Sequence, residues 1–398
     1  MSAAAPFLTL TRPPVPLAAA SFVSSFDRLA VTPLLVLIAG ELQVPLATAV
    51  AVASGYYLAY GVSQPFWGLL SDRFGRVRVM RLALLGAGLA GLASAAMPVL
   101  PALIVSRVAA GACFGAVIPT SLTYVGDTVA VSVRQHALSH LMGLMALGTA
   151  LATGFGGLLG DAAGWRAVFT VTAVCALVCA PALRVLPEPP RAEIGGLGRH
   201  VGTVLRSRWA RLVFALAFVE GAVLLGTLTF LATVLQQQGV SSALAGLAAA
   251  GYGVGVYLFS QVVKRLAGGW PVWRLILTGG TQMGAGYAIL AVEANVVTVA
   301  LTALLLGGGW SFMHSSLQTW ATSVVPQARG TTVAFFASCL FMGSAVSSWA
   351  AGPLAGSGSY TLLFGLAAAV TVPLTAVAAA GRRRYGSRAP EEGAPRPE

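Results

Sequence analysis

The chain alternates between long apolar stretches and short polar connections. A helix that crosses a bilayer needs about 20 apolar residues, and twelve stretches come close to that length. The pattern therefore predicts an all-α membrane protein with twelve transmembrane helices. The stretches cover residues 17–39, 47–70, 80–98, 101–124, 136–159, 165–186, 211–235, 241–262, 274–293, 296–321, 331–353 and 361–380.

A long polar segment divides these stretches into two groups of six. It is rich in proline, glycine and arginine, which is typical of a linker. An internal repeat supports the division. Residues of the first half recur 195 positions later: Arg134, Gly148, Gly157 and Phe169 correspond to Arg329, Gly343, Gly352 and Phe364. The alternative is chance matching among abundant glycines. We therefore predict two pseudo-symmetric six-helix bundles over 1–186 and 211–381, a cytoplasmic linker over 187–210, and a cytoplasmic tail over 382–398 that is basic and then acidic and proline-containing.

Composition narrows the class of protein further. Of the 398 residues 57% are hydrophobic and only 9% are charged, and the mean hydropathy is +0.82. Little of the chain is left for a soluble catalytic domain, and it contains no Walker loop, HExxH motif or convincing nucleophile and base arrangement. The four cysteines lie in apolar stretches without a CxxC pair. We expect no enzyme, no metal site and no cofactor.

The basic residues report orientation rather than a ligand. The net charge of +12 would suggest a nucleic-acid partner in a soluble protein. Here 21 of the 24 basic residues fall in connections or tails that alternate to one side, and only Arg166 lies in a connection on the other. This positive-inside pattern predicts a multi-pass protein of the cell membrane with both termini in the cytoplasm, surrounded by the lipid bilayer and without a nucleic-acid partner.

Charged residues inside the apolar stretches are the first candidates for chemistry, because each costs about 2.5 to 3.5 kcal/mol at a helix centre. Asp27 is our leading proton carrier, with Arg107 as its partner. A poorly hydrated carboxyl group prefers its neutral form, whereas a neighbouring guanidinium favours the charged form. The alternative is a permanent structural pair. Glu220 is a second protonatable or cation-binding candidate, or else forms a static hydrogen bond, and nothing obvious near it in the sequence neutralises it.

Polar positions in the same stretches predict a substrate cavity. Ser21, Ser25, Arg28 and Thr32 recur at helical spacing, and such a stripe should line a wet cavity rather than face lipid. Arg28 is expected either to attract an anionic group on the substrate or to neutralise Asp27. The other candidates for the cavity are Tyr57, Thr227, His314 and Gln318.

A charged turn follows the second apolar stretch. It reads Gly68-Leu-Leu-Ser-Asp72-Arg73-Phe-Gly75-Arg76-Val-Arg78. An acid in such a turn can face the positive end of a neighbouring helix and pair with arginines, then release them as two halves separate. A loop that only sets orientation would need neither the acid nor the glycines.

This turn resembles the signature loop of the major facilitator superfamily. Arg107-Val-Ala-Ala-Gly111-Ala-Cys-Phe-Gly115 is similar to the buried-arginine motif of that family, and Asp127 with Arg134 matches its acid and base after the fourth helix. The resemblance covers nearly the whole chain. It implies the major facilitator fold, in which two bundles alternate in access around a central site, and a cytoplasmic gating network of Asp72, Arg76 and Asp127.

The fifth stretch bears on the direction of transport. Gly148, Gly156 and Gly157 fit the spacing of the family's antiporter motif, but Ala152-Thr153 stands where that motif has Gly-Pro. The run Gly164-Trp165-Arg166 and Phe169 look like the twelve-helix drug:proton antiporter branch.

We therefore expect a monomeric, proton-coupled exporter that uses the proton gradient for efflux of small, at least partly apolar compounds such as drugs or metabolites, as in multidrug resistance. The first alternative is a proton-coupled symporter or facilitator that imports a sugar, organic acid or other nutrient. The second is a membrane scaffold or receptor that moves nothing, for which charged groups at mid-membrane would be costly.

Overall fold

The computed structural model describes residues 12–189 and 197–386. The first half of the molecule contains six spans built from long helices with short breaks. They comprise α1 (Val15–Ala30), η1 (Thr32–Leu34) and α2 (Leu35–Glu41); α3 (Leu46–Ala49) and α4 (Ala51–Phe74); α5 (Arg76–Ala96); α6 (Leu100–Phe114) and α7 (Val117–Thr128); and α8 (Val131–Ala182) with η2 (Leu183–Val185).

One helical stretch in this half is long enough to cross the membrane twice. The run Val131–Val185 has 55 residues, or about 80 Å at 1.5 Å per residue, against a hydrocarbon core of about 30 Å. Gly164 breaks it with φ 78° and ψ 163°, a conformation that favours glycine. Eleven helical stretches in the described residues are long and apolar enough to span. Because Val131–Val185 is long enough for two spans, the eleven stretches provide twelve spans, which confirms the twelve predicted helices.

The second half repeats the arrangement. It comprises α9 (Leu197–Arg206); α10 (Arg208–Gly221), the π-helical η3 (Ala222–Gly226) and α11 (Leu231–Gln237); α12 (Ser242–Ala249) and α13 (Gly251–Leu266); α14 (Val272–Val292); α15 (Val296–Gly309), the π-helical η4 (Trp310–His314) and α16 (Ser315–Val324); η5 (Pro326–Ala328) and α17 (Arg329–Gly356); and α18 (Tyr360–Gly386). Helix α9 lies inside the predicted linker, and α18 continues past the predicted end of the bundle at 381. The exact domain boundaries stay predictions.

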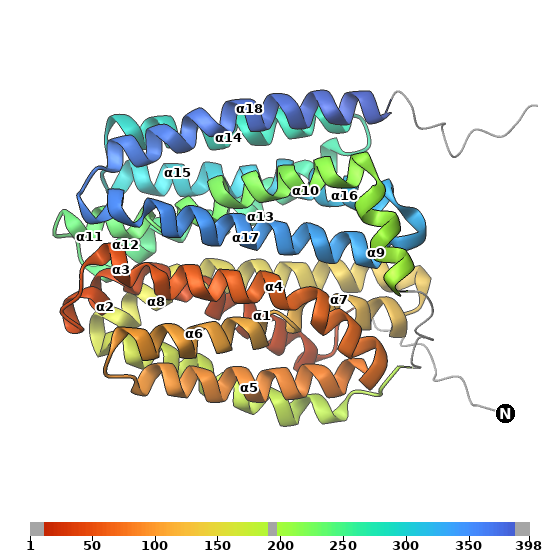
Figure 1. The fold of residues 1–398 in the computed structure, drawn as a ribbon, viewed down its shortest axis with the longest axis horizontal. Helices are drawn as coiled ribbons and strands as arrows, with labels where there is room; N and C mark the ends of the chain where they lie inside the picture. The colour runs from red at the N-terminus through yellow and green to blue at the C-terminus, as the bar shows by residue number, and fades with distance from the viewer. Residues whose placement is uncertain (1–11, 190–196, 387–398) are drawn as a thin grey trace, which may run out of the picture.

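The two halves form two layers of nearly parallel helices, with α1 to α8 below and α10 to α18 above in Figure 1. They meet where α4 packs against α17 and where α8 packs against α12 and α13. The basic connections and helix ends, at the right of Figure 1, make up what we call the basic face. This face carries Arg73, Arg76, Arg78, Lys264, Arg265, Arg382, Arg383 and Arg384.

Close contacts join the halves at the end opposite the basic face. The side-chain amide of Gln236 donates to the carbonyl of Pro33 at 2.6 Å, and the hydroxyls of Ser54 and Ser348 are 2.9 Å apart. Toward the basic face, a Cβ added at Gly68 on α4 would meet no atom within 4 Å. The molecule is therefore closed at the face opposite the basic one.

Candidate functional site

A buried ion pair lies in the middle of the first half. The guanidinium of Arg107 on α6 contacts the carboxylate of Asp27 on α1 through two bonds of 2.9 and 3.3 Å. The two residues are 0% and 1% exposed. The hydroxyl of Thr172 on α8 donates to the same carboxylate at 3.0 Å. Three spans thus converge on one carboxylate, whose charge is balanced by a bidentate partner.

Two aromatic rings flank the arginine of this pair. The guanidinium carbon of Arg107 lies 4.6 Å from the ring centre of Tyr56 and 4.5 Å from that of Phe169. Gly111 makes room for this packing, because a Cβ there would lie 2.5 Å from the carbonyl oxygen of Tyr56. Cation–π contacts of this kind offset part of the cost of removing the guanidinium from water.

A second acid and base pair lies in the other half. Nδ1 of His314 is 3.2 Å from Oε2 of Glu220, and both residues are buried. The indole of Trp310 stacks on the imidazole at 3.7 Å between ring centres. Among the residues that the structure describes, none forms a hydrogen bond with Oε1 of Glu220. The sequence near Glu220 offers no obvious group to neutralise it, and the fold instead brings an imidazole from a distant span into contact with its carboxyl group. The partner is 94 residues away in the chain, and folding alone brings it close.

Arg28 points away from its neighbour Asp27 and toward the second half. Its guanidinium carbon lies 5.6 Å from the ring centre of Phe341 on α17, and the hydroxyl of Tyr60 interacts with Arg28 and Ser24. Adjacent helix positions differ by about 100°. Arg28 therefore does not share the buried pocket in which Asp27 meets Arg107.

The polar stripe of the first span is packed rather than wet. Ser21, Ser25 and Thr32 are almost fully buried. The Thr32 hydroxyl donates to the carbonyl of Leu29 at 2.9 Å, and a Cβ at Gly148 of α8 would lie 3.3 Å from that of Ser25. The expectation of a wet cavity along this stripe is thus wrong for these three residues, because α8 covers much of this face of α1.

The remaining residues predicted for the cavity are distributed over both halves. Tyr57 on α4 and Thr227 between η3 and α11 are buried, and the hydroxyl of Thr227 donates to the carbonyl of Ala222 at 3.3 Å. Gln318 on α16 keeps part of its surface exposed. These positions surround the boundary between the halves without forming one hydrogen-bonded group.

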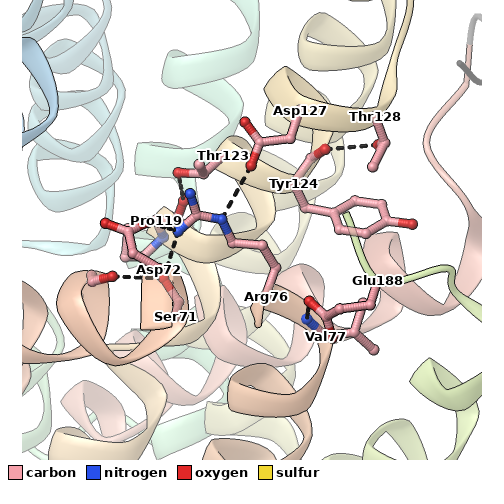
Figure 2. A network of polar contacts seen from close by, with 11 residues as sticks. Ser71, Asp72, Arg76, Val77, Pro119, Thr123, Tyr124, Asp127, Thr128 and Glu188 are labelled. Carbon is pink, nitrogen blue, oxygen red and sulfur yellow. Dashed lines mark hydrogen bonds and ion pairs between the residues drawn. The ribbon is translucent and has the colours of Figure 1, made fainter. Parts of the chain in front are cut away.

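A polar network on the basic face joins three of the residues of the signature loop (Figure 2). The guanidinium of Arg76 contacts the carboxylate of Asp72 and that of Asp127 at 3.1 Å. It also donates to the hydroxyl of Ser71 at 2.8 Å. Arg76 therefore links α4 and α5 to the end of α7, the arrangement that the family resemblance implies.

Two other basic residues of the motif make different contacts. The guanidinium of Arg73 lies over the ring of its neighbour Phe74. Arg134 donates to the backbone carbonyl of Val129 at 3.1 and 3.2 Å. Arg134 thus closes the connection between α7 and α8 instead of pairing with Asp127.

An acid from the predicted linker holds the connection between α4 and α5 in place. At the start of α5, the carboxylate of Glu188 accepts a bond of 3.0 Å from the backbone N–H of Val77 (Figure 2). It accepts a second bond, of 3.1 Å, from the backbone N–H of Arg78. Gly75 allows this approach: its φ is 103°, and a Cβ there would lie 2.6 Å from the carboxyl carbon of Glu188. The carboxylate thus occupies the positive end of the helix.

Sequence reasoning did not select Thr172, Glu188 or Phe341. Glu188 had a usable signal, because it is an acid between two prolines in a segment whose charged residues are mostly basic. Thr172 and Phe341 had none, since threonine and phenylalanine are ordinary residues of membrane helices.

The glycines of the fifth span face two different neighbours. Gly148 and Gly156 lie against α1, where a Cβ would meet carbonyl oxygens of Phe22 and Ala30 at 2.7 and 3.2 Å. A Cβ at Gly157 would lie 2.4 Å from the carbonyl oxygen of Ser242 on α12, in the other half. Gly157 is therefore a contact point between the halves.

Replacing Gly157 with leucine is expected to open this contact. Overpacking costs about 1 to 3 kcal/mol, which reduces the population of the closed arrangement roughly five- to hundredfold. This population is measured as the extent of disulfide formation in a Ser54→Cys/Ser348→Cys variant that lacks the four natural cysteines. Gly143→Leu on the same helix is the matched control, because a Cβ there meets nothing within 4 Å. Equal crosslinking in both variants would contradict the assignment.

Comparison with known proteins gives one family and several relatives. A family model described as Major Facilitator Superfamily matches residues 17–348. A chloramphenicol resistance protein of Streptomyces lividans is 28% identical over 74% of this chain and 75% of its own length. Among solved structures, a bacterial homolog of the human lysosomal transporter Spinster matches with a TM-score of 0.76 at 15% identity, over 95% of this chain and 98% of its own. A D-xylose-proton symporter matches with a TM-score of 0.73 at 16% identity, over 90% and 96%.

Proposed function

Because this chain belongs to the major facilitator superfamily, a family of membrane transporters, we propose that it exports small, at least partly apolar compounds in exchange for protons. The observation that carries the proposal is the buried pair of Asp27 and Arg107. A carboxylate held in a dry interior needs its cation, and it takes up a proton when the cation moves away. The pair thus couples a change of helix packing to the uptake or release of a proton.

The state of the molecule fits one step of such a cycle. The positive-inside pattern assigns the basic face to the cytoplasm, together with both termini. The contacts between Gln236 and Pro33, and between Ser54 and Ser348, then close the outer side. In this state Asp27 is paired with Arg107. In the proposed cycle this corresponds to a transporter that is closed to the outside and whose carboxylate is paired with its cation.

The network of Arg76 supplies a gate for this cycle. It ties the cytoplasmic connection between α4 and α5 to α7, all within the first half. Because α4 packs against α17 of the second half, a shift of the connection is transmitted to the boundary between the halves. Each chain holds both halves, so a monomer in the cell membrane suffices for transport.

Similarity to a relative, and not the fold, favours export over import. The chloramphenicol resistance protein is named for resistance to a compound, and removal of that compound from the cell is a form of resistance that fits outward transport. The rival function is proton-coupled symport or facilitated import of a nutrient. It is supported by Ala152 and Thr153, which leave the middle of the fifth span without the proline of the antiporter motif.

The direction of coupled proton movement tests the proposal. Purified protein is placed in liposomes containing a pH dye, and chloramphenicol, D-xylose or 1-naphthoate is added on one side. Antiport predicts that addition of a transported compound drives protons in the direction opposite to the compound. Liposomes without protein, and liposomes whose pH gradient has been collapsed by an ionophore, are the controls. Proton movement in the same direction as the compound would replace export with symport.

A further inference from the structure

Arg28 lies at mid-depth in the first span, and no acid of the described residues forms an ion pair with it. It lies 13 positions after Val15, or about 20 Å along the helix. Arginine stays protonated in proteins. Asp27 and Leu29 on either side are 1% and 0% exposed, whereas Arg28 keeps part of its surface exposed. Its guanidinium lies over Phe341 of the second half, so the exposed part faces the boundary between the halves.

The acids near this depth are already engaged. Asp27 is held by Arg107 and Thr172, and Glu220 contacts His314. The other acids of the described residues lie at or near the ends of spans: Glu41, Asp72, Asp127, Asp161, Glu188 and Glu293. Within residues 12–189 and 197–386, Nε of Arg28 is buried without a hydrogen-bond partner. A cation at this depth is therefore open to an anion from outside the chain.

The surroundings of this cation are aromatic. The rings of Tyr60 and Phe341 lie 4.5 Å apart, and Tyr57 lies 6.5 Å from Phe341. Tyr252 on α13 is also close enough to interact electrostatically with Arg28. The rings come from both halves, and aromatic rings suit a flat apolar body more than a strongly hydrated one.

We propose that the transported compounds are organic anions, in which a carboxylate pairs with the guanidinium of Arg28 and a flat apolar body packs against Phe341 and Tyr60. This inference rests on the transport function proposed above, but it does not depend on proton coupling. A guanidinium binds a carboxylate through two parallel hydrogen bonds, and such charge-assisted bonds are stronger than neutral ones. An inside-negative potential drives an anion outward and a proton inward, so both ions of an antiport cycle move with the field.

Exchange of matched probes between the two sides of a liposome tests the assignment. Benzoate, 1-naphthoate and 4-phenylbutyrate are compared with their neutral amides, with passive leak subtracted using liposomes without protein. The wild type is expected to exchange at least one carboxylate roughly tenfold or more faster than its amide. Arg28→Gln should lower the exchange rate of that carboxylate to the exchange rate of its amide. Arg28→Lys should retain part of the preference for the carboxylate, since lysine keeps the charge but loses the bidentate geometry.

A matched control separates this site from a general effect of charge. Arg73→Gln removes an exposed arginine of the same half and should leave the preference unchanged. Thermal unfolding checks that each variant is folded, and also measures whether a carboxylate stabilises the wild type more than Arg28→Gln. Equal exchange of carboxylates and amides by the wild type, an intact preference in Arg28→Gln, or no exchange and no stabilisation by any carboxylate would overturn the inference. Exchange needs no proton gradient, so failure of coupled proton flux alone would leave the substrate class supported.

Discussion

Replacing Asp27 with asparagine is expected to abolish coupled proton movement while substrate exchange continues. Asparagine has nearly the same shape as aspartate but carries no titratable group. Each proton that moves inward across the membrane releases about 2.3 kcal/mol per 100 mV of membrane potential. Losing one proton from the cycle therefore lowers the sustainable substrate gradient by about fiftyfold at 100 mV. Uphill transport into or out of liposomes with an imposed potential measures this ratio, and the pH dye reports the proton.

Three further variants make the result specific to Asp27. Asp27→Glu keeps a titratable carboxyl and should retain part of the coupling. Asp161→Asn removes an exposed acid of the same half and should have no effect. If coupling persists unchanged in Asp27→Asn and is lost in Glu220→Gln, then the proton travels on the pair of Glu220 and His314, and Asp27 is structural.

Replacing Arg107 with leucine is expected to lower the free energy of unfolding by about 3 to 5 kcal/mol. The reason is that removal of one partner leaves the other charge buried and uncompensated. Here Asp27 would keep the hydroxyl of Thr172 as a polar contact but lose its cation, and the space between Tyr56 and Phe169 would lose the guanidinium that fills it. Thermal unfolding in detergent, compared with the wild type, detects a loss of this size.

A double variant distinguishes loss of the charge balance from loss of packing. Asp27→Leu/Arg107→Leu removes both charges and should recover most of the stability, because a buried ion pair replaced by apolar residues is often neutral or stabilising. It should nevertheless show no proton coupling. Arg73→Leu is the control, since an exposed arginine contributes about 1 kcal/mol or less. A double variant as unstable as Arg107→Leu would show that packing around the guanidinium, and not the charge of Asp27, sets the cost.

Much of the fold follows from the sequence because its cause is local. In a bilayer each spanning segment must satisfy its own backbone hydrogen bonds, so length and hydropathy alone identify the helices. The same logic singled out Asp27, Arg107 and Glu220, since a charge in an apolar span is costly wherever it points. The network of Asp72, Arg76 and Asp127 was accessible through family resemblance, because the residues of the turn that carries Asp72 and Arg76 are contiguous.

Only the tertiary structure decided which side chains face one another. Hydropathy does not record the rotation of a helix about its axis, and that rotation depends on contacts with other helices. It places Arg28 against Phe341 while its neighbour Asp27 meets Arg107. It buries Ser25 against α8, where Gly148 lets the two helices approach. It also brings His314 to Glu220 across 94 residues, because pairing between spans depends on packing geometry that no single span contains.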